Sequence, residues 1–426
     1  MVTVRRDREY SDSGGWCLSR GLVINKPIAI GRPSVLRHTN AHSILKLLRE
    51  CGSCSRADLV RASGLSAPTI TNVVKDLLSE GLVEPIGEGE SSGGRPPDMI
   101  RFKAERGCLL AVEISADRLS FLMTDLNGSE IEARKVSLTK RKTTPEAICG
   151  YIEDELKELL RRQKKTRAQL LALVVGVPAI TNVEAGSVLS ISTLQGWRSV
   201  PLRAMLGKIS KCLVIVENDT NLAAQGEQYC GAARAVTDFI FINIGTNVGA
   251  GIFLRGRIHH GSQWSAGEVA YLRLPSTSRR QPTIHEFGEL ETILTTSGIL
   301  RRWHEEAGRS RKSESSSDVA MDAPGILRLA QAGDARGEKI IRPLTEIVAD
   351  IIVNLSLILN PGLILLGGEV GSHPVLIDFV RKELEGGEFA VTKIASSELG
   401  DRAVLWGAIS LALEALPSVL LPQPTM

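Results

Sequence analysis

The chain has 426 residues, of which 43% are hydrophobic, and its 51 Lys and Arg nearly balance 48 Asp and Glu, which leaves a net charge of +3. Because ordinary domains hold roughly 100–200 residues, this length predicts two to four domains with enough apolar content for packed cores. Seven irregularly spaced cysteines argue against a disulfide-bonded secreted protein, and the charged, polar start argues against export or a membrane span. We therefore expect a cytoplasmic protein with no membrane partner.

Residues 1–35 mix charge with Gly, Ser and Pro and show no sustained period, which predicts a poorly ordered arm. The first 103 residues hold fifteen Lys and Arg against eleven Asp and Glu, a net charge of +4, and the remaining 323 residues sum to −1. A mildly basic front end is compatible with nucleic-acid binding by this part of the chain.

Residues 36–104 predict a winged helix-turn-helix unit. Three short stretches with helical apolar periodicity, each preceded by a residue that caps helix N-termini, predict three helices. The caps are Asn40, Ser55 and Ser66, and the helices end near Cys51, Ser63 and Glu80. Two strand-like runs, 82–83 and 99–102, follow the third helix, and a hairpin at this position is the wing of such units.

The outer face of the third helix and the wing carry the side chains that we expect to contact DNA. Short polar groups on the helix suit base edges and phosphates in a major groove, and an arginine in the Gly-rich wing suits the adjacent minor groove. These candidates are Ser66, Thr69, Thr71, Asn72, Lys75 and Arg95. The alternative is a unit for packing or dimerisation. Cys51-x-x-Cys54 lacks the further ligands of a zinc site.

From residue 105 to 426 the pattern is that of an α/β protein. Strand-like runs at 109–114, 118–124 and 131–138 are joined by turns and precede a helix from Pro145 to about Arg162 and a strand at 170–177. The same opening recurs at 239–258, which predicts two similar lobes with a cleft between them. Later segments predict an exposed loop at 305–323, a long helix at 340–359 and a last helix at 407–416 that Pro417 stops.

Polar residues gather between apolar runs from Leu213 to Tyr271. The run 213–216 delivers Glu217-Asn218-Asp219 at a strand end, where α/β proteins place ligand groups. A second run, 239–244, ends in a loop whose glycines let the backbone approach a bound group. This stretch predicts a small-molecule pocket.

Eight short motifs follow one another between Leu109 and the C-terminus. They are Gly176-Val177-Pro178-Ala179, Leu194-Gln195-Gly196-Trp197-Arg198, Glu217-Asn218-Asp219, Gly231-Ala232-Ala233-Arg234, Gly245–Gly251, Gly267-Glu268, Gly288-Glu289-Leu290-Glu291 and Asn360-Pro361-Gly362. In this order they resemble the ROK family of repressors, open reading frames and sugar kinases. With a winged helix in front, the chain resembles the xylose- and N-acetylglucosamine-responsive repressors of that family. The resemblance implies an α/β fold, a winged helix-turn-helix followed by a two-lobed, actin-like ATPase (ribonuclease H-like) domain.

One departure from the family bears on catalysis. Where ROK sugar kinases open with an Asp-x-Gly-x-Thr-like phosphate loop, this chain reads Glu113-Ile114-Ser115-Ala116-Asp117. Ser115 and Ala116 restrict the backbone, and the two acids add negative charge where ATP phosphates would lie. We therefore expect ATP binding to be lost or very weak and no residue to be catalytic. Asp219, the general base of the kinases, would serve as a base only if the chain were a kinase.

A second departure concerns zinc. The family's Cys-x-Cys-Gly-x-x-Gly-Cys cluster is missing from residues 279–289, and Tyr271 stands where the family has histidine. Three scattered histidines, His259, His260 and His285, do not replace a set of thiolates, so we expect no metal and no other cofactor.

The sugar-facing motifs agree better with the family. By resemblance, carboxylates and an amide would accept from and donate to paired sugar hydroxyls, and these residues are Asn218, Asp219, Glu268 and Glu291. The alternative is that they cap helices and satisfy loops in a ligand-free domain.

The sequence thus predicts a sugar-responsive transcriptional regulator, a repressor of sugar uptake or catabolic genes. A homodimer or tetramer would bind palindromic operator DNA through its winged helices, with a sugar effector in the cleft. Two alternatives stay open. One is an ATP-dependent sugar kinase that carries a DNA-binding head, and the other is a constitutive DNA binder whose larger domain only dimerises.

Overall fold

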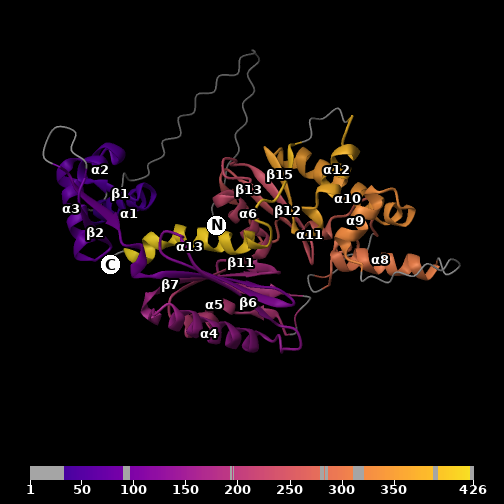
Figure 1. Cartoon of the computed structure of the whole chain (residues 1–426), viewed down its shortest axis with the longest axis horizontal. Helices are drawn as coiled ribbons and strands as arrows, with labels where there is room; N and C mark the ends of the chain where they lie inside the picture. Colours follow the sequence, from indigo (N-terminus) through magenta and orange to yellow (C-terminus); the bar gives the residue numbers. More distant parts are fainter. Residues whose placement is uncertain are drawn as a thin grey trace, which may run out of the picture.

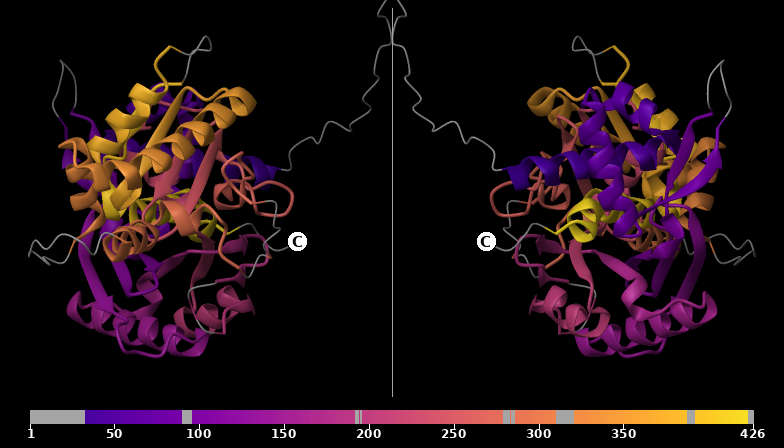
Figure 2. Two further views of the ribbon diagram at one scale, coloured as in Figure 1. Left: turned by 90° about the vertical axis from the view of Figure 1, so that its right-hand side faces the viewer. Right: turned by 90° about the vertical axis from the view of Figure 1, so that its left-hand side faces the viewer.

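The computed structural model describes residues 33–89, 96–191, 194, 196–278, 283, 286–309, 321–386 and 392–422. Figure 1 shows a small helical unit at one end and two lobes beside it, with the C-terminal helix running between them. The side views show one lobe above the other (Figure 2). The predicted organisation, a small N-terminal unit followed by two lobes, is confirmed.

The N-terminal unit packs three helices against a three-stranded sheet of order β1-β3-β2. Its elements are α1 Pro33–Cys51, β1 Ser53–Ser55, α2 Arg56–Ser63, α3 Ala67–Ser79, β2 Val83–Glu88 and β3 Asp98–Phe102. Ser55 and Asp58 form a capping box that starts α2, and Gly64 ends α2 in the left-handed region at φ 69°. The predicted helix-turn-helix and wing hairpin are confirmed.

One local prediction for this unit was wrong, and one short strand was not predicted. The first helix starts at Pro33, so Asn40 lies inside α1 and does not cap it. The extension before Asn40 is about two turns long, and Leu36 within it is 56% exposed. An exposed stretch carries no apolar period that would mark it in the sequence. The three residues of β1 pair with β3 and extend the hairpin, and so short a strand has no periodicity of its own.

The first lobe is a five-stranded sheet of order β11-β7-β4-β5-β6 with helices on its outer face. The three opening strands form an antiparallel meander, and the later two pair in parallel beside β4. The elements are β4 Cys108–Ile114, β5 Arg118–Thr124, β6 Glu130–Ser137, α4 Pro145–Arg162, β7 Leu170–Val177, α5 Leu202–Ser210 and β11 Leu213–Asn218. A small sheet of β8 Ile180–Asn182, β9 Ser187–Ser190 and β10 Arg198–Val200 is attached to it.

The second lobe repeats this arrangement with sheet order β14-β13-β12-β15-β16. Its strands are β12 Phe239–Ile244, β13 Val248–Leu254, β14 Arg257–Ile258, β15 Leu363–Gly367 and β16 Ile394–Ser396. Its helices are α7 Glu291–Leu294, α8 Thr296–Arg309, α9 Ala323–Gln331, α10 Ala335–Leu359, α11 Gly368–Gly371 and α12 Pro374–Glu383. The repeated opening predicts two similar lobes, and in both lobes a meander precedes two strands that add in parallel beside its first strand. Of the loop predicted at 305–323, residues 310–320 lie outside the described ranges, and α8 occupies its beginning.

Helices α6 Asp219–Cys230 and α13 Ala403–Leu420 cross between the lobes. Glycines let them touch, since a Cβ on Gly407 would lie 1.8 Å from the Leu222 carbonyl oxygen and one on Gly226 would lie 2.2 Å from that of Ala403. One apolar cluster joins α13 to the first-lobe sheet and to the core of the N-terminal unit. The DNA-binding candidate and the first lobe therefore share a core.

Helix α13 is longer than predicted, because Pro417 lies inside it and does not stop it. The long helix α10 likewise starts before residue 340 and contains Pro343. The stretch Gly400–Leu420 is long and apolar enough to cross a membrane, with a mean hydropathy of 1.7, and half of it is buried. Its contacts with α6, β4 and β7 are those of a core helix.

Candidate functional site

The turn from β11 into α6 positions the first two sugar-site candidates. β11 pairs in parallel with β7, so its carboxyl end opens at the edge where ligands bind in α/β sheets. Asn218 caps α6, and its Oδ1 accepts from the backbone N–H of Asn221 over 3.0 Å. Its Nδ2 donates to the carbonyl of Ala179 over 3.1 Å. Asp219 is thereby fixed as the first residue of the helix.

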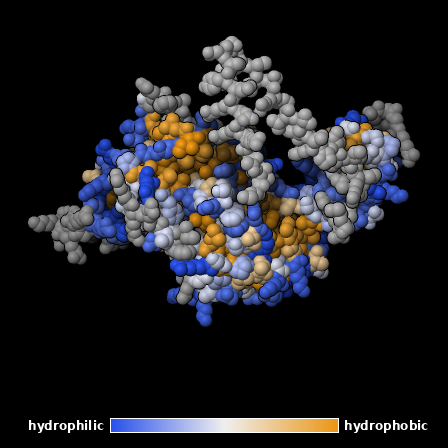
Figure 3. Space-filling model, turned by 180° about the vertical axis from the view of Figure 1, so that it is seen from behind, coloured by the Kyte–Doolittle hydropathy of each residue, from blue (hydrophilic) through white to orange (hydrophobic). Residues whose placement is uncertain are grey.

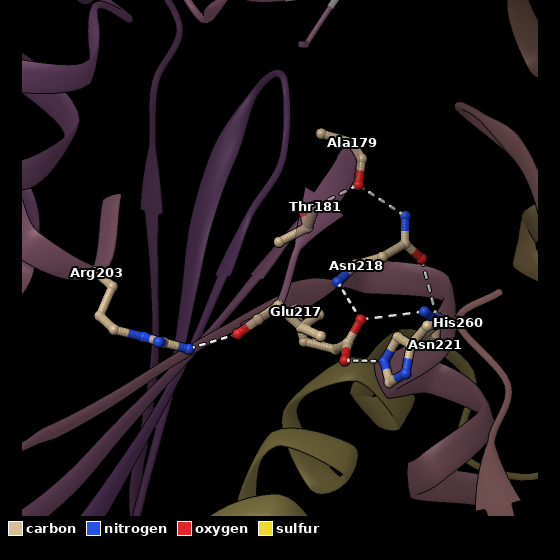
Figure 4. A network of polar contacts seen from close by, with 8 residues as sticks. Ala179, Thr181, Arg203, Glu217, Asn218, Asn221 and His260 are labelled. Atoms are coloured by element: carbon tan, nitrogen blue, oxygen red, sulfur yellow. Dashed lines mark hydrogen bonds and ion pairs between the residues drawn. The ribbon is translucent and has the colours of Figure 1, made fainter. Parts of the chain in front are cut away.

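A buried carboxylate network underlies this turn (Figure 4). Glu217 is 3% exposed, and its Oε1 accepts from the Asn218 N–H at 2.8 Å and from Asn221 Nδ2 at 3.0 Å. Its Oε2 lies 2.7 Å from His260 Nε2. The hydrogen bond to Glu217 raises the pKa of His260, which favours the charged pair. The pair ties the loop after β14 to the end of β11.

Three of the four sugar-site candidates form one acidic cluster. Burial raises the pKa of Asp219 to about 7, and the negative charge of Glu113 adds to this effect. Burial also raises the pKa of Glu268 to about 7, with further contributions from the charges of Glu291 and Asp219. The pKa of Glu291 is raised by burial as well, although its Oε2 accepts from the Gly288 N–H at 3.3 Å. The charges of Asp219 and Glu291 thus both act on Glu268, and the fourth candidate, Asn218, precedes Asp219 in the chain.

A cavity of about 740 Å³ lies between the lobes and meets this cluster at Asp219. Its walls include Glu113 and 115–118 from the first hairpin and 245–247 from the second. Asn218, Glu268 and Glu291 do not line it. Asp219 therefore belongs both to the acidic cluster and to the interlobe cavity, and the two hairpin loops face each other across that cavity.

The second loop is bound to Asp219 by an amide. Asn247 Nδ2 donates to Asp219 Oδ2 over 3.1 Å, and the Thr220 N–H donates to Oδ1 over 2.6 Å. Asn243 holds Asn247 in place, since its Nδ2 donates to Asn247 Oδ1 over 2.7 Å. Glu217 was predicted only as part of the motif at the strand end, and no role was predicted for Asn243, Asn247 or His260. A polar residue inside a buried strand run was the available signal for Glu217 and Asn243, and the sequence offers none for the partner of His260.

Tyr271 stands where the ROK family has a histidine. The Tyr271 hydroxyl donates to the carbonyl of Glu286 over 2.7 Å, and burial raises the pKa of Tyr271 to about 12. In the described part of the chain, no group of three or more His, Cys, Asp or Glu is arranged to hold a metal ion. His285 lies outside the described residues.

The outer face of α3 presents most of the DNA-contact candidates. Thr71, Asn72 and Lys75 are exposed, although the Thr71 hydroxyl also donates to the carbonyl of Ala67 over 2.9 Å. Ser66 caps α3, and its Oγ lies 2.8 Å from Thr69 Oγ1, so these two hydroxyls partner each other at the helix N-terminus. The wing candidate, Arg95, lies outside the described residues.

Comparisons with known proteins agree over nearly the whole chain. The sequence model of the ROK family matches residues 109–415, and that of a winged helix-turn-helix DNA-binding domain matches residues 37–84. The xylose repressor of Caldicellulosiruptor bescii is 24% identical over 91% of this chain and 99% of its own length.

Among solved structures, a ROK family transcriptional regulator that is a homologue of the Escherichia coli Mlc protein superposes with a TM-score of 0.73 at 23% identity. It covers 91% of this chain and 98% of its own. A ROK glucokinase from Streptomyces griseus, solved with glucose and AMPPNP, gives a TM-score of 0.60 at 23% identity and covers 72% of this chain and 99% of its own. The repressor-like structure thus includes the winged helix, and the kinase-like structure corresponds to the two lobes.

Proposed function

The chain belongs to the ROK family, and we propose that it is a sugar-responsive transcriptional regulator, a cytoplasmic repressor of sugar uptake or catabolic genes. Residues 36–104 would bind operator DNA and residues 105–426 would bind the sugar and oligomerise, with residues 1–35 as an arm. The similarity to the xylose repressor over 91% of the chain supports this assignment. The sugar hydroxyls would be bound by Asn218, Asp219, Glu268 and Glu291.

The proposal rests mainly on helix α13, which packs against both the ligand-binding lobes and the DNA-binding unit. Helix α6 starts at Asp219 and packs along α13, where Gln225 Nε2 donates to Ser410 Oγ and to Glu414 Oε1, both over 2.9 Å. Helix α13 in turn accepts from the DNA-binding unit, since Arg49 Nη1 donates to the carbonyl of Leu413 over 3.2 Å. Because packed helices move as rigid elements, a shift of α6 on sugar binding would reach α1 through α13.

A homodimer is the assembly that we propose. Two winged helices related by a twofold axis read the two halves of a palindromic operator. Apolar residues gather on the back of both lobes (Figure 3), and Leu357 and Ile358 at the end of α10 are 57% and 76% exposed. Exposed apolar patches of this kind support association between copies of the chain.

Catalysis is not part of the proposal. Glu113 and Asp117 put negative charge on the hairpin where a kinase would hold phosphates, and Ser115 and Ala116 restrict its backbone. The carboxylate of Asp219 would then act as a hydrogen-bonding group for the sugar.

An operator shift assay with the full chain tests this function. Fluorescence anisotropy would follow binding to operator-length DNA from the promoter regions near the gene, with and without xylose, glucose and N-acetylglucosamine. We expect sequence-preferring binding whose affinity one sugar changes at least tenfold, and Glu268→Gln should remove the sugar response while leaving DNA binding intact. Binding without sequence preference under every condition would refute the proposal. Intact DNA binding with no sugar heat in calorimetry would select a constitutive DNA binder.

A sugar kinase with a DNA-binding head is the second candidate, favoured by the environment of Asp219. Its pKa of about 7 suits a general base at neutral pH, and the two lobes have the fold of a ROK glucokinase. ATP-dependent phosphorylation of any of the three sugars, abolished by Asp219→Asn, would select this candidate over the regulator.

A further inference from the structure

The interlobe cavity is lined by several carboxylates, and only Asp219 among them has a role in the proposed sugar binding. Five carboxylates and two cations line it. Lys135 Nζ lies 2.5 Å from Asp401 Oδ2, and Arg118 Nη1 lies 3.5 Å from Asp117 Oδ1, so each cation has a carboxylate partner. Within the described ranges the other three carboxylates have no ion pair with Lys, Arg or His; these are Glu113, Asp219 and Glu369.

Glu113 is the deepest of these carboxylates. It is 8% exposed, Ser115 Oγ donates to its Oε1 over a long 3.4 Å, and its Oε2 has no hydrogen-bond partner in the described residues. Ser120, paired with Glu113 across the hairpin, also has a buried hydroxyl with no partner there. The charge of Arg118 on the same wall lowers the pKa of Glu113, but burial has the larger effect and raises it. An unpaired buried carboxylate oxygen is unfavourable, so Oε2 of Glu113 is a site for a further donor.

Glu113 and Asp219 flank the same glycine. Glu113 is paired in the sheet with Gly176, and a Cβ on Gly176 would lie 3.8 Å from Asp219 Cα and 2.8 Å from Val404 Cγ1. The negative charge of Glu113 accordingly contributes to the raised pKa of Asp219. The two acids thus share one end of the cavity, and the rim carries Asp117, Glu369 and Asp401, all of them exposed.

The charge and the shape of the interlobe cavity indicate which class of ligand it can bind. An acidic wall repels the phosphates of a nucleoside triphosphate. Part of the wall is apolar and comes from both lobes and from the helices between them; it includes Pro178, Ala223, Phe241 and Val404. A cavity of about 740 Å³ with an apolar wall and an acidic end suits an aliphatic chain with a cationic head.

We propose that the interlobe cavity binds a small aliphatic amine, with its ammonium group between Glu113 and Asp219 and its hydrocarbon against Phe241 and Val404. The ammonium supplies the donors that Glu113 lacks and offsets two carboxylates that share one site. The acidic rim attracts the same ligand from solution. The site shares Asp219 with the proposed sugar site but does not include Asn218, Glu268 or Glu291, and the proposal does not depend on a sugar response.

Isothermal titration calorimetry of the full chain at pH 8 tests the site. The probes are n-butylamine and 1,4-diaminobutane, with 1-butanol as the neutral compound of similar shape. We expect both amines to bind and 1-butanol to give no heat. Glu113→Gln keeps the shape of the side chain and should weaken amine binding about tenfold or more, because one charged partner is lost. Glu369→Gln, at the rim, should weaken it roughly threefold.

Asp154→Asn is the matched control, because Asp154 is 80% exposed on α4, outside the interlobe cavity, and the change removes the same charge. It should leave amine binding unchanged. Absence of heat with both amines, equal binding of 1-butanol, or an unchanged affinity in Glu113→Gln would overturn the proposal. Displacement of butylamine by ATP with Mg²⁺ would also overturn it and assign the cavity to a nucleotide. DNA shift assays on the same preparations keep these outcomes separate from those that test the regulator.

Discussion

Glu113 in the first lobe and Asn243 in the second occupy corresponding places and have opposite surroundings. Each stands one residue before the end of the first strand of a hairpin, and each is paired in parallel with a glycine, Gly176 for Glu113 and Gly367 for Asn243. The backbone frame is the same in both lobes. The chemistry of one side chain therefore sets the character of each loop.

In the second lobe, side-chain hydrogen bonds connect strand β12 to Asp219. The Asn243 amide holds Asn247, and the Asn247 amide reaches Asp219. In the first lobe the matching position holds a carboxylate whose Oε2 has no partner among the described residues. In the second lobe this position supports Asp219 through hydrogen bonds. In the first lobe it leaves a carboxylate oxygen without a partner in the described residues, and a ligand in the cavity could supply one.

The largest effect is expected from giving the second lobe the charge of the first. Asn243→Asp replaces the donor to Asn247 with an acceptor and adds a carboxylate to an acidic cavity. We expect the free energy of unfolding at pH 8 to fall by about 3 kcal/mol in urea denaturation. Asn127→Asp, the same change at an exposed turn, is the control. Equal losses in the two variants would show that the Asn243 bonds do not stabilise the fold.

The next largest effect is expected from alanine substitutions at the two glycines, Gly367 and Gly176. A Cβ on Gly367 would lie 2.1 Å from Cζ of the buried Phe241 ring, whereas one on Gly176 would meet side-chain methyl groups no closer than 2.8 Å. Gly367→Ala should lower the free energy of unfolding by about 2 kcal/mol, and Gly176→Ala by less, because methyl groups on rotatable side chains can shift more easily than a packed ring. Unfolding of both variants in urea measures the difference. The reverse order would contradict the packing described for the two strands.

Glu113→Gln should act in the opposite direction. Burial raises the pKa of Glu113 above its ordinary value of 4.5, so the folded protein holds a proton that the unfolded chain has released. Stability that depends on this proton is present below pH 4.5 and is lost as the pH rises through the folded pKa. The variant should be about 1 kcal/mol more stable than the parent at pH 8 and equally stable at pH 4. Thermal unfolding at both pH values measures this, and a variant less stable than the parent at pH 8 would show that Glu113 is favourable where it stands.

The stability of the Glu113→Gln variant should still depend on pH, because Asp219 and Glu268 also titrate. Their folded pKa values of about 7 lie above the ordinary 3.8 and 4.5, so they also make stability fall as the pH rises through that window.

The smallest effect is expected at the amide that links the second loop to Asp219. Asn247→Ala removes a hydrogen bond that favours the ionised carboxylate, so the pKa of Asp219 should rise further above about 7, by roughly half a pH unit. Carbon-13 chemical shifts of the Asp219 carboxyl during a pH titration report this value directly. Thr246→Ala, an exposed neighbour in the same loop, should leave it unchanged. A downward shift in Asn247→Ala would mean that the amide does not stabilise the charge.

Much of the fold was predictable, because the signals that fix elements are local. Caps at Ser55 and Ser66 and apolar stripes gave the helices α2 and α3, and the repeated strand–turn–strand opening gave the two lobes. Local signals failed where burial overrides propensity. Helix α13 continues through Pro417 because its apolar face lies in a core shared by the first lobe and the DNA-binding unit.

The residues of the candidate site were predicted from the sequence, whereas their hydrogen-bond partners were not. The motif at 217–219 is visible in the sequence at the end of an apolar run, and the acids Glu268 and Glu291 are assigned to the site by the resemblance to the ROK family. The partner of Glu217 is His260, 43 residues later, and no local pattern pairs them. Long-range pairing depends on how the sheet edges meet, which periodicity does not encode.

The sequence by itself determined the order of elements, the duplication and the chemical groups that the site can use, because these follow from residue type and spacing along the chain. Only the tertiary structure decided that Glu113 and Asn243 stand at corresponding places, and that α13 joins the ligand lobes to the DNA-binding unit. It also decided that Asp219 belongs to both the acidic cluster and the interlobe cavity. These facts depend on contacts between distant segments and on burial, which set hydrogen bonds and pKa values only after the chain has closed into its two lobes.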